Sequence, residues 1–241
     1  MTLNIINYNL HVYFKTLIMK SETTLKNNLN AVLILGTVWG ISEFAVGLGL
    51  HKCGVTLTGA ILTGMAFLWL SMAYSLTGKV LPVLFILLIV SVFKFSDALF
   101  LDVGVTHGSI LNPVFAFLTI TVGFLTMLLL IKKRFTHKLI YRILTGAGAA
   151  FIAVFLFPMA GLFTGSAACV LPATSIPVSI YTSPVSIALS MITVPLGFYL
   201  AGKFQNNISK IRSLQHGFVS YIWSPLFFLV CLITITLIRI I

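Results

Sequence analysis

Seven stretches of the chain are apolar and long enough to cross a lipid bilayer as helices. A crossing helix needs about 20 apolar residues, with a range of about 17–25. A helix also satisfies its backbone hydrogen bonds within the segment, as lipid requires. The sequence therefore predicts an all-α, polytopic transmembrane helix bundle of six to seven spans. The candidate spans are residues 30–50, 56–76, 79–95, 109–131, 139–164, 183–202 and 219–239.

Composition places the chain among membrane proteins. Of its 241 residues, 59% are hydrophobic and only 8% are charged, whereas a soluble domain would have about a quarter charged. The polar stretches are too short to form a second domain. We therefore expect a polar cytoplasmic segment at residues 1–29 and a single transmembrane helical domain at residues 30–241. We expect no cleaved signal peptide, and Met19, which precedes a polar run, is a second candidate for the true start.

The basic residues predict how the chain is oriented. A net charge of +11 would favour nucleic acid as a partner of a soluble protein, but here Lys and Arg lie mostly in loops and we expect no nucleic-acid partner. Three basic clusters fall on one side when seven spans are threaded, and the positive-inside rule makes that side cytoplasmic. The N terminus is thus predicted to be cytoplasmic, and the protein a multi-pass protein of the cell (inner) membrane. Cys53 and Cys169 would both face outward, where a disulfide between them is one possibility.

Three of the four acidic residues, Glu43, Asp97 and Asp102, lie inside or at the edge of apolar segments. A carboxylate in hydrocarbon costs roughly 2.5–3.5 kcal/mol on insertion scales, so it usually faces protein or a water-filled cavity. These three positions are therefore candidates for contact with a substrate or an ion.

Glu43 shares one helical face with Gly36 and Gly40 in the first predicted span. Glycines at this spacing let another helix approach closely, so Glu43 is expected to point into a packed seam or a cavity beside it. Two interpretations are open: Glu43 contacts a substrate or ion, or it is a buried glutamate bonded to Ser, Thr or Lys94 of neighbouring helices.

Polar residues also gather where the outer ends of two spans are expected. Lys94, Asp97, Asp102 and His107 surround the end of the third span, and His51 ends the first span on the same side. Two imidazoles and two carboxylates are suitable ligands for a divalent metal. However, no tight ligand motif is present, so we favour polar loop residues that neutralise nearby lysines, and we expect no metal and no cofactor.

Further candidates for ligand contact are less specific. Trp39 could stack on a flat ligand, although aromatic residues are equally typical of the membrane interface. Asn112 opens the fourth span at its outer end and is another candidate contact. The Ser- and Thr-rich run from Thr174 to Ser186 could supply hydroxyls to a ligand from an outer loop, or it could be only a loop.

Motifs of enzymes are absent from the sequence. It contains no Gly-x-Ser-x-Gly elbow, no phosphate-binding glycine loop with lysine, and no His-Glu-x-x-His. We therefore do not expect an enzyme. Any energy for transport would come from an ion gradient or from a partner subunit.

The first two spans resemble a known family. The segments GTVWGISE (36–43), GLGLH (47–51) and TGAIL (58–62) are similar to the opening of some substrate-binding S components of energy-coupling-factor (ECF) transporters. The resemblance implies a small membrane protein that captures a vitamin, its precursor or a metal ion from outside. Such a protein docks on a transmembrane coupling subunit driven by two cytoplasmic ATPases.

The resemblance also assigns roles to residues of this chain. Small residues of the first helix mediate docking in the family, and Gly36 and Gly40 are the matching positions. The loop after the first helix gates the site, and residues 51–55 occupy its place. The family typically has six spans, so a seventh is a departure. Its cobalt-binding members carry a histidine next to the N-terminal methionine, where Thr2 stands here, so cobalt and nickel are discounted.

The leading prediction is a substrate-binding subunit of an ECF-type importer that captures a vitamin or precursor. Its predicted substrate contacts are Trp39, Glu43, His51, Asp97, Asp102, His107 and Asn112. The alternative is a stand-alone secondary transporter or channel with Glu43 as its ion or proton site. A third reading is a non-transport membrane protein, either an assembly factor or an enzyme acting on lipids.

Overall fold

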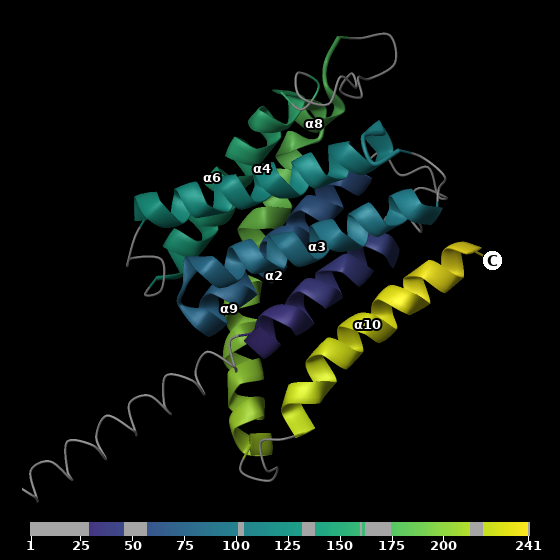
Figure 1. Ribbon diagram of the computed structural model, residues 1–241. Helices are drawn as coiled ribbons and strands as arrows, with labels where there is room; N and C mark the ends of the chain where they lie inside the picture. The colour runs from purple at the N-terminus through teal and green to yellow at the C-terminus, as the bar shows by residue number, and fades with distance from the viewer. Residues whose placement is uncertain are drawn as a thin grey trace, which may run out of the picture.

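The computed structural model describes residues 29–45, 57–100, 104–131, 138–159, 161, 175–212 and 219–240. These residues are almost entirely helical, which confirms the predicted all-α class (Figure 1). The first helix is Leu29–Ala45. The helices that follow are α2 (Thr58–Thr77), α3 (Val80–Phe100), α4 (Gly108–Ile131), α6 (Leu139–Leu156) with the 3-10 turn Phe157–Met159, α8 (Val178–Tyr181), α9 (Ser183–Arg212) and α10 (Val219–Ile240).

Four helices in the described part of the chain are long and apolar enough to cross a membrane. They are Thr58–Thr77, Gly108–Ile131, Leu139–Met159 and Ser183–Gln205. Three shorter apolar helices accompany them, Leu29–Ala45, Val80–Ser96 and Ser224–Thr234. Each of the seven predicted stretches thus contains a helix. The number of crossings and the side on which the N terminus lies stay predictions.

The four long helices pack into one interlocked core. Helix α2 lies along α9, α9 lies against α6, and α6 lies against α4. A glycine permits each close approach: Gly123 of α4 faces the backbone of α6, Gly146 of α6 faces that of α9, and Gly197 of α9 faces that of α2. Small residues at such crossings bring backbones close enough for extensive van der Waals contact, which is what holds helices together in lipid.

Aromatic rings fill the space between the core and the neighbouring helices. The ring of Phe124 lies 6.3 Å from that of Phe67 and 6.5 Å from that of Tyr74, measured between centroids. Trp39 of the first helix meets Phe117 of α4 edge-on at 5.5 Å. Offset and edge-on pairs of this kind are favourable beyond the area they bury, so these contacts tie α2, α4 and the first helix together.

The first helix, α3 and α10 flank the core. The first helix packs on α3, where a Cβ added at Gly36 would lie 2.9 Å from Ile89 and one at Gly40 would lie 2.5 Å from a ring carbon of Phe93. Phe93 also meets Phe228 of α10 edge-on at 5.2 Å. Figure 1 shows α10 at the edge of the molecule. Helix α3 therefore connects both flanking helices to the core.

Large apolar side chains cover the outer surface of the bundle. Leu129 and Leu130 of α4 are each 70% exposed, and Ile192 of α9 is 65% exposed. A soluble protein rarely exposes apolar patches of such extent, whereas lipid tails solvate them readily. The surface therefore agrees with the lengths of the helices in indicating a membrane protein.

Candidate functional site

A cavity of about 200 Å³ lies at one end of the four-helix core. Its walls come from the start of α2, from α4, from the end of α6 and its 3-10 turn, and from α8 with the start of α9. The lining residues are Gly59, Thr63, Ala116, Thr119, Ile120, Ala153, Val154, Phe157, Val178, Ser179, Thr182 and Ser186. Gly59 is itself exposed, which indicates that the cavity reaches the surface beside the first turn of α2.

Helix α8 forms one wall of the cavity. Pro177 precedes it with φ −58° and ψ 134°, an extended conformation that starts rather than continues a helix. The Pro177 carbonyl accepts hydrogen bonds from the amides of Ile180 and Tyr181, at 3.0 and 3.1 Å. The single turn thus formed ends at Thr182, and α9 begins at the next residue. This short turn brings Ser179 and Thr182 to the cavity.

Five hydroxyl groups line the cavity, and four of them donate to carbonyl oxygens of their own helix. The donors and acceptors are Thr63 to Gly59 at 2.7 Å, Thr119 to Ala116 at 2.9 Å, Thr182 to Val178 at 2.9 Å and Ser186 to Thr182 at 3.3 Å. A hydroxyl has one hydrogen and two lone pairs. Because these four hydrogens are used within the helices, the four groups offer a ligand only acceptor oxygens.

The fifth hydroxyl, Ser179, differs from the others. Its Oγ is buried and has no hydrogen-bond partner among the described residues. Leaving a buried polar group unpaired costs roughly 1–3 kcal/mol. Ser179 is therefore the lining group that gains most from a ligand or a water in the cavity, and it is free to donate as well as accept.

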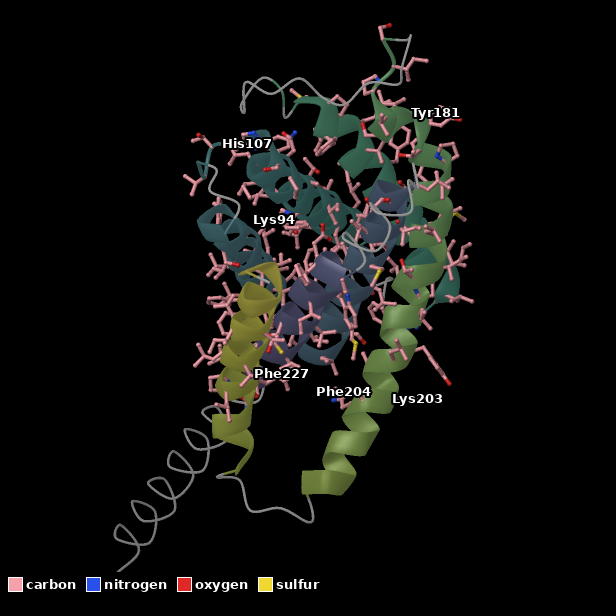
Figure 2. All side chains as sticks on the ribbon, turned by 90° about the vertical axis from the view of Figure 1, so that its right-hand side faces the viewer. Lys94, His107, Tyr181, Lys203, Phe204 and Phe227 are labelled. Carbon is pink, nitrogen blue, oxygen red and sulfur yellow. The ribbon has the colours of Figure 1, made fainter. Side chains whose placement is uncertain are left out.

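No lining residue that the structure describes carries an ionisable side chain. Lys79 follows the end of α2 and Arg142 is in the first turns of α6, 4.4 Å above the ring of Phe198, both toward the other end of the core. Lys94, near the end of α3, lies in the same half of the molecule as His107 (Figure 2) but is not among the residues that line the cavity. Lys203 lies about 25 Å beyond Ser186 along α9, at 1.5 Å per residue. Figure 2 shows Tyr181 of α8 at one end of the molecule and Lys203 toward the opposite end.

Trp39 and Asn112 do not line the cavity. Trp39 is 1% exposed, and its ring packs on Phe117 inside the protein. The predicted stacking surface is thus used by a neighbouring helix, although the indole Nε1 has no hydrogen-bond partner among the described residues. Asn112 is half-buried near the start of α4, one turn before the lining residue Ala116, and is not itself among the lining residues.

Glu43 and His107 lie elsewhere as well. Glu43 is half-buried near the end of the first helix. His107 is exposed at the start of α4, where its Nδ1 lies 2.8 Å from Ser109 Oγ and accepts from the Ser109 amide at 3.3 Å. Its carbonyl accepts from the amides of Ile110 and Leu111. These contacts cap the helix, which gives His107 a structural role whether or not it meets a substrate.

Several predictions fall outside what the structure describes. His51, Asp102, Cys53 and Cys169 are outside the described residues, as is the predicted gating loop, and the side chain of Asp97 is too. Across the described ranges, no three His, Cys, Asp or Glu side chains come close enough to hold a metal ion. The predicted substrate contacts at these positions stay predictions.

Gly36 and Gly40, the predicted docking positions, face α3 of this same chain. The close approach of Ile89 and Phe93 is sufficient reason for glycine at both positions. The docking role stays a prediction, and in this structure the face that would carry it is covered.

Part of the cavity lining belongs to the Ser- and Thr-rich run from Thr174 to Ser186, a candidate source of hydroxyls in the sequence. Ser179, Thr182 and Ser186 of that run line the cavity, whereas Thr63 and Thr119 were not singled out. The two missed threonines lie in apolar helices, where a hydroxyl bonded to its own backbone is common, so no local pattern marks them. Comparison with protein families, curated proteins and solved structures finds no match to this chain.

Proposed function

We propose that this protein is the membrane-embedded substrate-binding subunit of an ECF-type importer, which captures a small molecule from outside the cell. The observation that carries the proposal is the cavity, with the unpaired Ser179 hydroxyl in its wall, at the end of the core opposite Lys79, Arg142 and Lys203. By the positive-inside rule the basic end faces the cytoplasm, which orients the cavity outward.

The core around the cavity is suited to binding. Ligand sites in helical proteins commonly lie between helices and combine apolar walls with a few polar groups. Here the four long helices that form the wall are held by three glycine-mediated crossings. Walls held in this way keep their hydroxyls in place, which lowers the entropic cost of binding.

The energy for import would come from partner subunits. The sequence has no nucleotide-binding motif, so a coupling subunit and two cytoplasmic ATPases would drive release to the inside. Because α3 covers Gly36 and Gly40, docking on these two glycines would require α3 to move. Docking on another face of the bundle would not.

Co-purification tests the proposal. The protein is expressed with its genomic neighbours, purified in mild detergent, and analysed by mass spectrometry for proteins and small molecules. We expect a coupling subunit, two ATPases and a retained small molecule.

The contrary result would be a protein that retains neither partners nor a small molecule. The stand-alone secondary transporter then becomes the account to test, by proton- or sodium-coupled uptake into liposomes that contain this protein alone. In that account Glu43→Gln abolishes uptake, whereas in ours the protein alone catalyses none.

A further inference from the structure

The walls of the cavity define which hydrogen-bonding groups a ligand must carry. Thr63, Thr119, Thr182 and Ser186 have already given their hydrogens to backbone carbonyls. While those hydrogen bonds are kept they present lone pairs, and among the described lining hydroxyls Ser179 is the one whose hydrogen is not already bonded. A ligand that satisfies this wall must bring N–H or O–H donors of its own.

The described residues that line the cavity carry no charge. A carboxylate or phosphate would meet acceptor oxygens with no described cation among the lining residues. An ammonium would find acceptors but no described carboxylate among the lining residues. Burying an ion without a partner of opposite charge is far more costly than burying a neutral group.

The volume sets the size of the ligand. A cavity of roughly 150 Å³ lined by apolar side chains holds benzene, and this cavity measures about 200 Å³. It therefore accommodates one ring with small substituents. Ile120, Val154 and Phe157 provide apolar walls for the faces of such a ring.

We propose that the cavity takes an uncharged single-ring compound whose N–H or O–H groups bond to the hydroxyl oxygens, with Ser179 as the group that completes the site. The proposal rests on the proposed function, because it names the substrate class of that same cavity. It excludes anionic and cationic substrates.

Four ring compounds of similar size test the class: phenol, toluene, benzoate and benzylamine, which is protonated at pH 7. Binding to the detergent-solubilised protein is measured by saturation-transfer NMR. We expect phenol to bind about two- to tenfold more tightly than toluene, as one added hydrogen bond predicts. Benzoate and benzylamine are expected to give no specific signal.

Two glycine variants separate cavity binding from partition into detergent. A Cβ at Gly59 or at Gly202 meets nothing within 4 Å, so a side chain can begin at either position without a clash. Gly59 lines the cavity, while Gly202 lies on the distant part of α9. The phenol signal should be lost in Gly59→Leu and retained in Gly202→Leu. Equal signals in the two variants would mean that phenol binds elsewhere, which overturns the proposal.

Ser179→Ala tests the completing hydroxyl. Its matched control is Ser91→Ala on α3, where the hydroxyl bonds the Leu87 carbonyl at 2.8 Å and lies away from the cavity. Ser179→Ala should weaken phenol binding by about two- to tenfold and leave toluene unchanged, while Ser91→Ala changes neither. A purely structural role for Ser179 would instead change the binding of both compounds alike.

The failure of this inference is distinguishable from the failure of the proposed function. A retained native ligand that is anionic or cationic, and that is lost in Gly59→Leu, would overturn the substrate class and leave the binding subunit in place. Specific phenol binding by a protein without partner subunits would support the cavity chemistry while contradicting the importer.

Discussion

Glycines at the helix crossings and the glycine at the mouth of the cavity have opposite surroundings. Gly146 of α6 presses on the backbone of α9, with the carbonyl oxygen of Ser190 and the amide of Met191 against the position of an added Cβ. Gly59 of α2 has nothing within 4 Å of that position. Close contact in the first region and open space in the second show where the core is held and where it has room for a ligand.

This helical core is tightly packed at its crossings and open at the cavity end. Three crossings, at Gly123, Gly146 and Gly197, bind α2, α4, α6 and α9 into one unit. At the cavity end the one-turn helix α8 and the 3-10 turn after α6 take the place of a further crossing. Replacing a glycine at a crossing by leucine should therefore reduce stability much more than replacing a glycine in open space.

The largest effect is expected for Gly146→Leu. The side chain would force α6 and α9 apart, and overpacking of this kind costs typically about 1–3 kcal/mol, with more where backbone must move. We expect a loss of about 3 kcal/mol or more, seen as aggregation or a sharply lower Tm in detergent. Gly202→Leu is the control, and an unchanged Tm for Gly146→Leu would mean that this crossing is not tight.

A smaller effect is expected for Gly40→Ala. The added methyl would meet the ring of Phe93, a side chain of a flanking helix that can turn aside more easily than backbone. We expect a loss of about 1–2 kcal/mol, measured as a shift in Tm. A loss as large as that of Gly146→Leu would place the first helix within the rigid core. Loss of co-purified partner subunits at unchanged Tm would instead support docking at this glycine.

A still smaller change in stability is expected for Thr182→Val. Valine keeps the shape but removes the hydroxyl that bonds the Val178 carbonyl at 2.9 Å, and that carbonyl still accepts the Thr182 amide. The loss should be about 0.5–1.5 kcal/mol, by thermal unfolding. Because an acceptor oxygen leaves the cavity, phenol binding should fall while toluene binding holds, and a parallel fall in both would contradict the assigned role.

The smallest effect concerns the basic end. Replacing Arg142 by Gln removes the contact of its guanidinium with the ring of Phe198, worth about 0.5–1 kcal/mol at exposed sites. We expect a Tm shift near the limit of measurement and unaltered ligand binding, because Arg142 is remote from the lining residues. Loss of ligand binding in Arg142→Gln would show that the cavity depends on the basic end of the core, which contradicts this expectation.

The all-helical class was predictable from the sequence because helix formation in lipid follows from the length of an apolar stretch, whereas the number of crossings and the side of the N terminus stay predictions. The site was predictable only in part. Ser179, Thr182 and Ser186 were within reach, since a polar run between prolines is visible locally. The contribution of Thr119 depends on how α4 packs against α6 and on α8 lining the same cavity, which no local pattern reports.

Two other candidates have structural contacts that the sequence did not reveal. Trp39 has an aromatic ring that could stack on a ligand. In the structure that ring packs edge-on against Phe117, a residue distant in sequence that the fold brings close. His107 has the chemistry of a ligand, yet its contacts are those of a helix cap. Residue type alone does not separate a ligand contact from packing or capping.

The central claim is that the cavity beside Gly59 holds the captured molecule, and the most direct measurement is the amount of small molecule retained per mole of purified protein. Mass spectrometry would compare the wild type with Gly59→Leu and Gly202→Leu, prepared identically from the same cells. We predict the same compound in the wild type and Gly202→Leu, and its loss from Gly59→Leu at an unchanged Tm. Equal retention by both variants would contradict the account.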